Sequence, residues 1–156
     1  MNRDQKKEIH LSSQKNQFRI GIVVADFHFD ITEKLLEGAK EILLSYGVLE
    51  EKITTVHVPG AFEIPLACLR LAKIRYDALI AIGCVIRGDT DHYTFVAGES
   101  NRGIMKVMIE QEIPIANCIL TLENLKQAHD RCGKKDNKGS EVAVAALLMA
   151  GTPKHV

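Results

Sequence analysis

The segment GCVIRGDTDHYTFV, residues 83–96, joins the end of an apolar run to a polar turn and the start of a helical pattern. The run that ends at Ile86 predicts a strand, and the spacing after the turn predicts a helix over 94–111. Such a junction leaves the N–H groups of the first helical turn without partners, and the helix dipole favours an anion there. The candidate phosphate-binding turn comprises Gly88, Asp89 and Thr90.

His92 follows this turn directly, and histidine is the side chain best suited to proton transfer near neutral pH. Taken alone, however, the pattern is more often an ordinary loop between a strand and a capped helix, with an inert histidine. Other segments of the chain have to decide between the two interpretations.

The chain has 156 residues, which predicts one domain large enough to bury a core. Hydrophobic residues make up 46% and charged residues 26%, within the range of globular proteins. The formal net charge is zero, so the basic excess typical of nucleic-acid-binding proteins is missing. We therefore expect no nucleic-acid partner.

The four cysteines are widely spaced and form no C-x-x-C pair, which argues against a zinc knuckle or a redox pair. Three of them lie in apolar runs, which predicts buried free thiols in a reducing compartment. Residues 1–17 are polar and contain no apolar signal core, and no run is long enough to cross a membrane. We expect a cytoplasmic protein with a solvated tail over 1–17, in which 9–11 could pair with another chain's sheet.

Apolar runs and helical periodicities alternate along the remaining chain. Strands are predicted at 19–25, 53–58, 77–86 and 114–121, and helices at 30–46, 65–73, 94–111, 123–131 and 140–149. A capping box of Asp30 and Glu33 predicts the start of the first helix, and Thr121 is the predicted cap of the fourth. This order predicts an α/β fold with a four-stranded parallel sheet and helices on both faces. The small sheet and its apolar helices favour an oligomer.

Several side chains stand where a ligand could bind. Phe27 follows the first strand, at the edge where open α/β sheets bind ligands, although it could equally close the core. Glu63, enclosed by apolar residues and prolines, either complements a helix dipole or faces a polar ligand. Arg131 and Lys138 are two candidate cationic contacts, and a solvated surface is the alternative for both.

Four segments together resemble the lumazine synthase family of the riboflavin pathway. They are VPGAFEIPL (58–66), YDALIAIGCVIRGDTDHYTFVAGE (76–99), QAHDRCG (127–133) and NKGSEVAVAALLM (137–149). Their combination and order are specific, and the resemblance extends from Arg19 to Met149.

The resemblance implies a flavodoxin-like three-layer sandwich, here one domain over 18–156. It implies homopentamers with active sites between neighbouring subunits, and larger cages in some members. The implied reaction condenses 5-amino-6-(D-ribitylamino)uracil with 3,4-dihydroxy-2-butanone 4-phosphate. It yields 6,7-dimethyl-8-ribityllumazine, phosphate and water, and needs neither a metal nor a redox cofactor.

The resemblance also implies roles for single residues. Phe27 resembles the aromatic residue that stacks on the pyrimidine, and His92 resembles the proton-transfer residue. The other matches are Ala61, Phe62 and Glu63 at the ribityl chain, Cys84, Val85 and Ile86 at the pyrimidine edge, Gly88, Asp89, Thr90 and Arg131 at the phosphate, and Lys138 with Glu141 near the ribityl end.

The sequence departs from the family pattern at three points. Asn117 stands where many relatives have a phenylalanine that reaches the neighbouring pocket, and His28 stands where asparagine is frequent. The connector between Arg131 and Asn137 is one residue shorter than in many members, so the choice between pentamer and cage stays open.

Two other interpretations also stay open. One is a non-catalytic member that binds a lumazine or flavin or forms a shell. The other is a flavodoxin-type electron carrier, although the junction ADFHFD (25–30) lacks the Ser/Thr/Gly-rich loop of such carriers.

Overall fold

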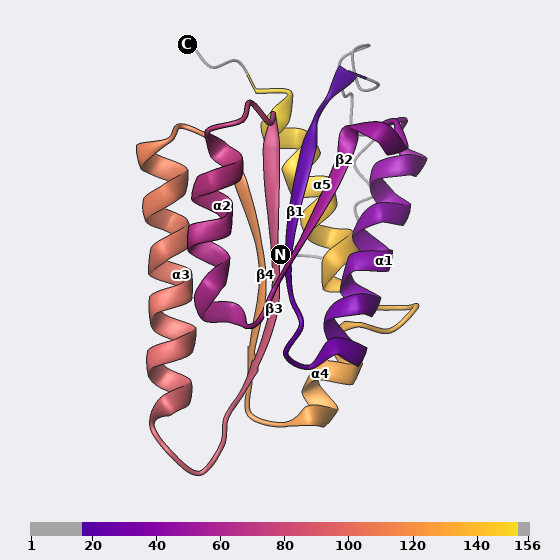
Figure 1. Cartoon of the computed structure of the whole chain (residues 1–156). Coiled ribbons are helices and arrows are strands. Elements are labelled where there is room, and N and C mark those ends of the chain that lie inside the picture. Colours follow the sequence, from indigo (N-terminus) through magenta and orange to yellow (C-terminus); the bar gives the residue numbers. More distant parts are fainter. Residues whose placement is uncertain (1–16, 153–156) are drawn as a thin grey trace.

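Four parallel strands form the centre of the computed structural model, which describes residues 17–152 (Figure 1). The strands are β1 (Ile20–Ala25), β2 (Ile53–Val58), β3 (Ala78–Ile86) and β4 (Ile115–Leu122), in the spatial order β2-β1-β3-β4. The helices are α1 (Phe29–Ser45), α2 (Ile64–Ala72), α3 (His92–Glu110), α4 (Leu125–Arg131) and α5 (Lys138–Ala150), with the short 3-10 helices η2 (Glu50–Lys52) and η3 (Ala61–Glu63). The predicted α/β three-layer fold with a four-stranded parallel sheet is confirmed.

The two central strands explain why the sequence pattern predicts the sheet well. All six residues of β1 are buried, and so are all residues of β3 except Ile86. A strand covered by helices on both faces needs apolar side chains at consecutive positions, which is the pattern of both runs. The edge strand β2 is mostly half-buried, in keeping with its threonines and His57.

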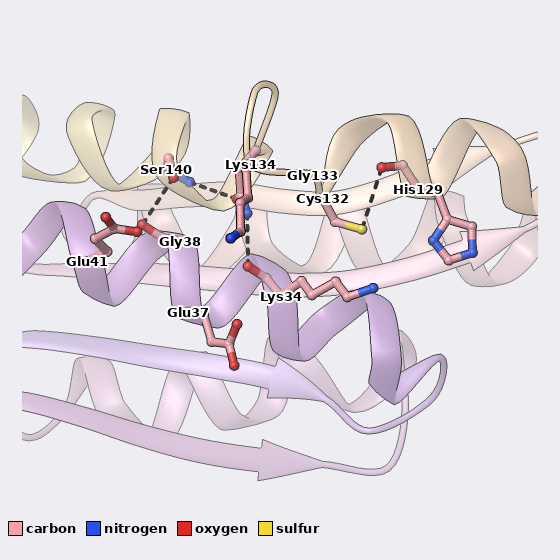
Figure 2. Close-up of a pocket in the computed structure, with 10 residues that line it drawn as sticks. Lys34, Glu37, Gly38, Glu41, His129, Cys132, Gly133, Lys134 and Ser140 are labelled. Atoms are coloured by element: carbon pink, nitrogen blue, oxygen red, sulfur yellow. Dashed lines mark hydrogen bonds between the residues drawn. The ribbon is translucent and has the colours of Figure 1, made fainter.

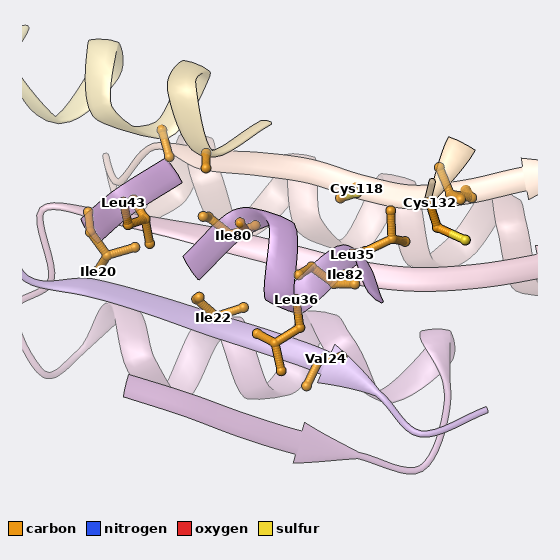
Figure 3. Packing of buried hydrophobic residues seen from close by; sticks show 14 of the residues in the cluster. Ile20, Ile22, Val24, Leu35, Leu36, Leu43, Ile80, Ile82, Cys118 and Cys132 are labelled. Atoms are coloured by element: carbon orange, nitrogen blue, oxygen red, sulfur yellow. The ribbon is translucent and has the colours of Figure 1, made fainter. Parts of the chain in front are cut away.

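The sheet separates two hydrophobic cores. On one face, Ile20, Ile22 and Val24 pack with α1, α4 and α5 (Figure 3). On the other face, Val23 and Ala25 pack with α2 and α3. Side chains alternate along a strand, so neighbouring residues of β1 enter different cores. Residues on α4 and α5 therefore lie across the sheet from those on α2 and α3.

The predicted capping box at Asp30 and Glu33 is wrong. Helix α1 begins at Phe29, and His28 precedes it in the left-handed region with φ 61°. The carbonyl oxygen of His28 accepts hydrogen bonds from the N–H groups of Ile31 and Thr32, at 2.9 and 3.1 Å. The backbone turn after β1 starts this helix, and Asp30 only adds a negative charge to its first turn.

Other predicted helix starts also need correction. Thr121 stays in β4, and Asn124 caps α4 by accepting a hydrogen bond from the N–H of Gln127 at 3.0 Å. Asn137 caps α5 in the same way, so this helix begins two residues before the predicted Ser140. Helix α3 begins at His92 instead of Thr94.

The predicted tail over 1–17 lies outside the described residues except for Gln17, and the pairing segment 9–11 lies wholly outside them. Within 17–152, none of the helices has both the length and the apolar character that a membrane span requires.

Candidate active site

A cavity of about 480 Å³ opens at the carboxyl edge of the sheet, where open α/β folds bind ligands. Its size suits a small-molecule ligand. Eight of the predicted site residues line it: Phe27, Ala61, Phe62, Glu63, Cys84, Val85, Ile86 and His92. The remaining lining residues are Gly60, Phe95 and Val96, which the sequence pattern did not single out. Phe95 could have been found, because it follows His92 by three residues on α3 and so shares its helix face.

Three aromatic rings at this cavity are unusually exposed. Phe27 is 66% exposed, Phe62 57% and Phe95 65%. Large apolar groups gathered around one cavity and open to solvent indicate a binding surface for a ligand or another protein chain. A flat aromatic ligand could stack on any of these rings.

The end of β3 supplies the inner wall of the cavity. Within the described residues, β1 pairs with β3 only as far as Val24 opposite Ile82, whereas β4 continues beside β3 to Ile86. One side of the last β3 residues therefore has no neighbouring strand. Backbone N–H and C=O groups on that side are free to bind the polar edge of a heterocycle.

The thiol of Cys84, at this end of β3, is not set up as a nucleophile. Burial, together with smaller contributions from the neighbouring Cys132 and Asp30, raises the pKa of Cys84 to about 12. The thiol therefore stays protonated near neutral pH, and attack would require the thiolate. The position fits substrate contact better than covalent chemistry.

Arg87 anchors the polar turn after β3. Its N–H donates to the carbonyl oxygen of Leu122 at 2.9 Å, and its Nε donates to Glu123 Oε2 at 2.9 Å. Its guanidinium group also lies 4.3 Å from the ring centroid of Tyr93, within the range of a cation–π contact. Both ends of the turn are thus held, while the residues between them stay exposed.

The start of α3 lies at the rim of this cavity. His92 lines the cavity and is the first residue of the helix, and its N–H donates to Thr90 Oγ1 at 3.4 Å. Asp91 makes no side-chain cap, so its carboxylate does not occupy the N–H groups of the first helical turn. Asp89 and Thr90 do not line the cavity itself, but they form the turn that leads into it.

Three predicted site residues lie away from this cavity within the chain. Arg131 ends α4 and Lys138 begins α5, across the sheet from η3, α2 and α3. Arg131 Nη1 donates to the carbonyl oxygen of Gln127 at 3.0 Å. Lys138 Nζ donates to Glu141 Oε1 at 2.6 Å, and this bond raises the pKa of Lys138. The lysine therefore stays positively charged.

Asn117, the third of these residues, is on the edge strand β4. Its Nδ2 donates to Asn101 Oδ1 on α3, and its Oδ1 accepts the N–H of Ile119 at 2.9 Å. Within its own chain, Asn117 is thus held against α3 and does not reach the cavity.

A second hollow of about 620 Å³ lies on the other face, between α1 and the connector from α4 to α5 (Figure 2). Its charged lining residues are Lys34, Lys134, Glu37 and Glu41. The cations and carboxylates are equal in number, which favours no particular ligand charge. Ser140, also in the lining, already donates to the carbonyl oxygen of Gly38 at 3.1 Å. None of the predicted site residues lines this hollow.

The fold and the first cavity define a flavodoxin-like α/β protein with a cavity of small-molecule size at the carboxyl edge of its sheet. Residues 17–154 match the family model described as 6,7-dimethyl-8-ribityllumazine synthase. A protein of that name from Albidiferax ferrireducens is 50% identical over 135 residues, which cover 86% of this chain and 84% of the relative. The chain belongs to the 6,7-dimethyl-8-ribityllumazine synthase family. Its activity is that of a transferase in riboflavin biosynthesis.

Proposed function

We propose that the cavity at the carboxyl edge is the site of lumazine synthesis and that a neighbouring subunit completes it. The reaction joins 5-amino-6-(D-ribitylamino)uracil and 3,4-dihydroxy-2-butanone 4-phosphate to 6,7-dimethyl-8-ribityllumazine, with release of phosphate and water. One observation carries the proposal: eight residues from four separate segments, all predicted from the sequence, line this one cavity.

The pyrimidine substrate binds between the ring of Phe27 and the free side of the β3 end. Stacking on the ring satisfies the flat faces of the heterocycle. The unpaired backbone groups beyond Ile82 bind its polar edge. The ribityl chain then runs along Ala61, Phe62 and Glu63, where the Glu63 carboxylate accepts hydrogen bonds from hydroxyl groups.

The phosphate of the second substrate binds at the start of α3. The helix N-terminus and the turn of Gly88, Asp89 and Thr90 offer N–H groups to an anion. The carboxylate of Asp89 repels phosphate, so the backbone of this turn makes the contact. A cation is needed to balance the remaining charge, and Arg131 of an adjacent chain supplies it.

His92 moves the protons of the reaction. Imine formation, phosphate elimination and ring closure each require a proton transfer, and His92 lies beside both binding regions. Holding two reactants in place can lower the barrier by roughly 7–11 kcal/mol, and a positioned acid or base typically contributes about 10²–10⁴-fold. Because both substrates are already reactive, we assign the larger share to orientation.

The need for a second subunit follows from the sheet. The sheet lies between the cavity side and the helices that carry Arg131 and Lys138 within one chain. In addition to the exposed rings of Phe62 and Phe95, α2 and α3 carry further exposed apolar residues, Leu66 and Met105 among them. These features support a homo-oligomer, and the pentamer is the form that we propose. Asn117 then contributes to the neighbour's site from the edge strand β4.

The four buried free cysteines fit a reducing compartment, and we infer that the enzyme acts in the cytoplasm.

The initial rate of lumazine formation from the two purified substrates tests the proposal. The absorbance of the product is followed with and without the protein, because these substrates could condense slowly unaided. We expect acceleration that saturates in both substrates. Product binding without acceleration would instead support a binding module, and tight binding of FMN with reversible reduction would support an electron carrier. Light scattering on the same sample distinguishes a pentamer from a larger assembly.

A further inference from the structure

A side-chain pair joins the carboxyl ends of β1 and β2. His57 Nδ1 lies 2.8 Å from Asp26 Oδ1, so that its N–H donates to the carboxylate. Both side chains are about half exposed, at 44% and 53%. Neither residue lines the cavity, but each is followed in the chain by residues that do.

The pair lies between the two segments that carry the aromatic wall. β1 leads directly into Phe27, and β2 leads through Pro59 into Gly60 and η3. Two backbone hydrogen bonds already join these segments, from Asp26 N–H to the Val58 carbonyl at 2.8 Å and from Phe27 N–H to the Pro59 carbonyl at 3.1 Å. The His57–Asp26 bond is a third link, and it is the one that side-chain substitution can remove.

Phe27 depends on such a link because little else holds its ring. The side chain is 66% exposed, and its aromatic neighbour is the edge of the His28 ring, with centroids 4.7 Å apart. The residue after Phe27 then enters the left-handed region. A ring without a packed socket is positioned mainly by its own backbone.

We propose that Asp26 and His57 are positioning residues that hold Phe27 at the angle required for stacking on the heterocyclic substrate. The inference rests on the proposed function, because it assumes that the pyrimidine stacks on Phe27. The pair acts by coupling the β1–α1 turn to the end of β2, so that Phe27 and η3 keep a constant separation.

Steady-state kinetics of His57→Ala and Asp26→Ala test the inference. We expect each variant to raise the KM for the ribitylaminouracil about two- to fivefold, the range of an exposed ion pair. The kcat and the KM for the sugar phosphate should change by less. The two variants remove the same bond, so either one decides the question if the other does not fold. An unchanged KM in a folded variant overturns the inference.

Asp26→Asn provides the rescue test. Its amide oxygen still accepts the hydrogen bond from His57, so the KM should stay close to that of the wild type. Lys106→Ala is the matched control, because it removes an exposed ion pair with Glu110 at the end of α3 remote from His92, where the Nζ–Oε1 distance is 3.8 Å. A raised KM in this control would assign the effect to general destabilisation, and the inference would fail.

A double-mutant cycle with Phe27→Ala separates the inference from the function on which it rests. If the pair acts through Phe27, His57→Ala should have no further effect on the KM in the Phe27→Ala background. If His57→Ala raised the KM equally in the wild-type and the Phe27→Ala backgrounds, the positioning role of the pair would be overturned, while the stacking role of Phe27 would stand. An unaffected KM in Phe27→Ala alone would overturn the stacking role, and the inference with it.

Discussion

Gly139 in the first turn of α5 lies directly against the carbonyl group of Leu35 in α1. A β-carbon at position 139 would be 1.9 Å from that oxygen. The contact is reinforced by Asn137, whose Nδ2 donates to the carbonyl oxygen of Lys34 at 2.9 Å. The backbones of α1 and α5 are therefore in direct contact at Gly139. The Asn137 side chain also ties the connector that leads into Lys138 to α1.

We predict that Gly139→Ala destabilises the protein by about 2–3 kcal/mol, because a backbone oxygen cannot move aside as a flexible side chain can. Urea denaturation measures the loss. Gly98→Ala on α3 is the matched control, since its β-carbon would meet the end of the exposed Arg102 side chain at 3.3 Å. It should stabilise the helix by up to about 1 kcal/mol. A Gly139→Ala variant as stable as the wild type would contradict the close contact.

Cys68 should make stability depend on pH above 9. Burial raises the pKa of Cys68 from 9.0 to about 12, whereas the unfolded chain ionises near the ordinary value. The unfolded state then binds fewer protons, so the stabilisation is complete below pH 9 and is lost as pH rises toward 12. In Cys68→Ala, the free energy of unfolding should fall with rising pH less steeply than in the wild type. The two slopes should differ by about 1.4 kcal/mol per pH unit. Equal slopes in urea titrations between pH 9 and 11 would refute this account.

His92→Ala should slow turnover by at most a few hundredfold, within the usual range of roughly 10²–10⁴ for one acid or base. The reason is that orientation of the two substrates survives the substitution. Single-turnover rates at saturating substrate measure the effect, and His129→Ala, an exposed histidine elsewhere, should leave the rate unchanged. A complete loss of turnover in a folded variant that still binds both substrates would show that proton transfer by His92 contributes more than a few hundredfold.

Arg131→Ala should raise the KM for the sugar phosphate about tenfold or more, the value of a hydrogen bond to a charged group. The KM for the ribitylaminouracil should change little. Arg131→Lys keeps the charge and should recover part of the affinity, although not the forked geometry. An unchanged KM for the sugar phosphate in Arg131→Ala would exclude a phosphate contact.

The fold could be predicted because its main determinants are local. The apolar runs of β1 and β3 report burial on both faces, and β2 begins and ends at the predicted residues. Errors arose where the backbone or a neighbouring side chain decides the boundary. His28 starts α1 through a left-handed turn, and Asn124 displaces Thr121 as a cap because β4 continues one residue further.

The residues that line the candidate site could be predicted only in part, for a geometric reason. Carboxyl ends of parallel strands meet at one edge, so Phe27 and the end of β3 were expected together. Which helix covers which face depends on the whole topology, so the separation of Arg131 from His92 could not be foreseen. The Asp26–His57 pair depends on the register of β1 against β2, which short patterns do not specify.

Mixed oligomers of His92→Ala and Arg131→Ala chains test the central claim most directly. The two variants, with different tags, are co-expressed, and oligomers that contain both are purified. Rates are then measured at low sugar phosphate. If sites form between subunits, about one interface in four carries both wild-type residues. The mixture should then be roughly threefold or more as active as Arg131→Ala alone, and far more active than His92→Ala alone. Activity no higher than the average of the separate variants would contradict a site completed by the neighbouring subunit.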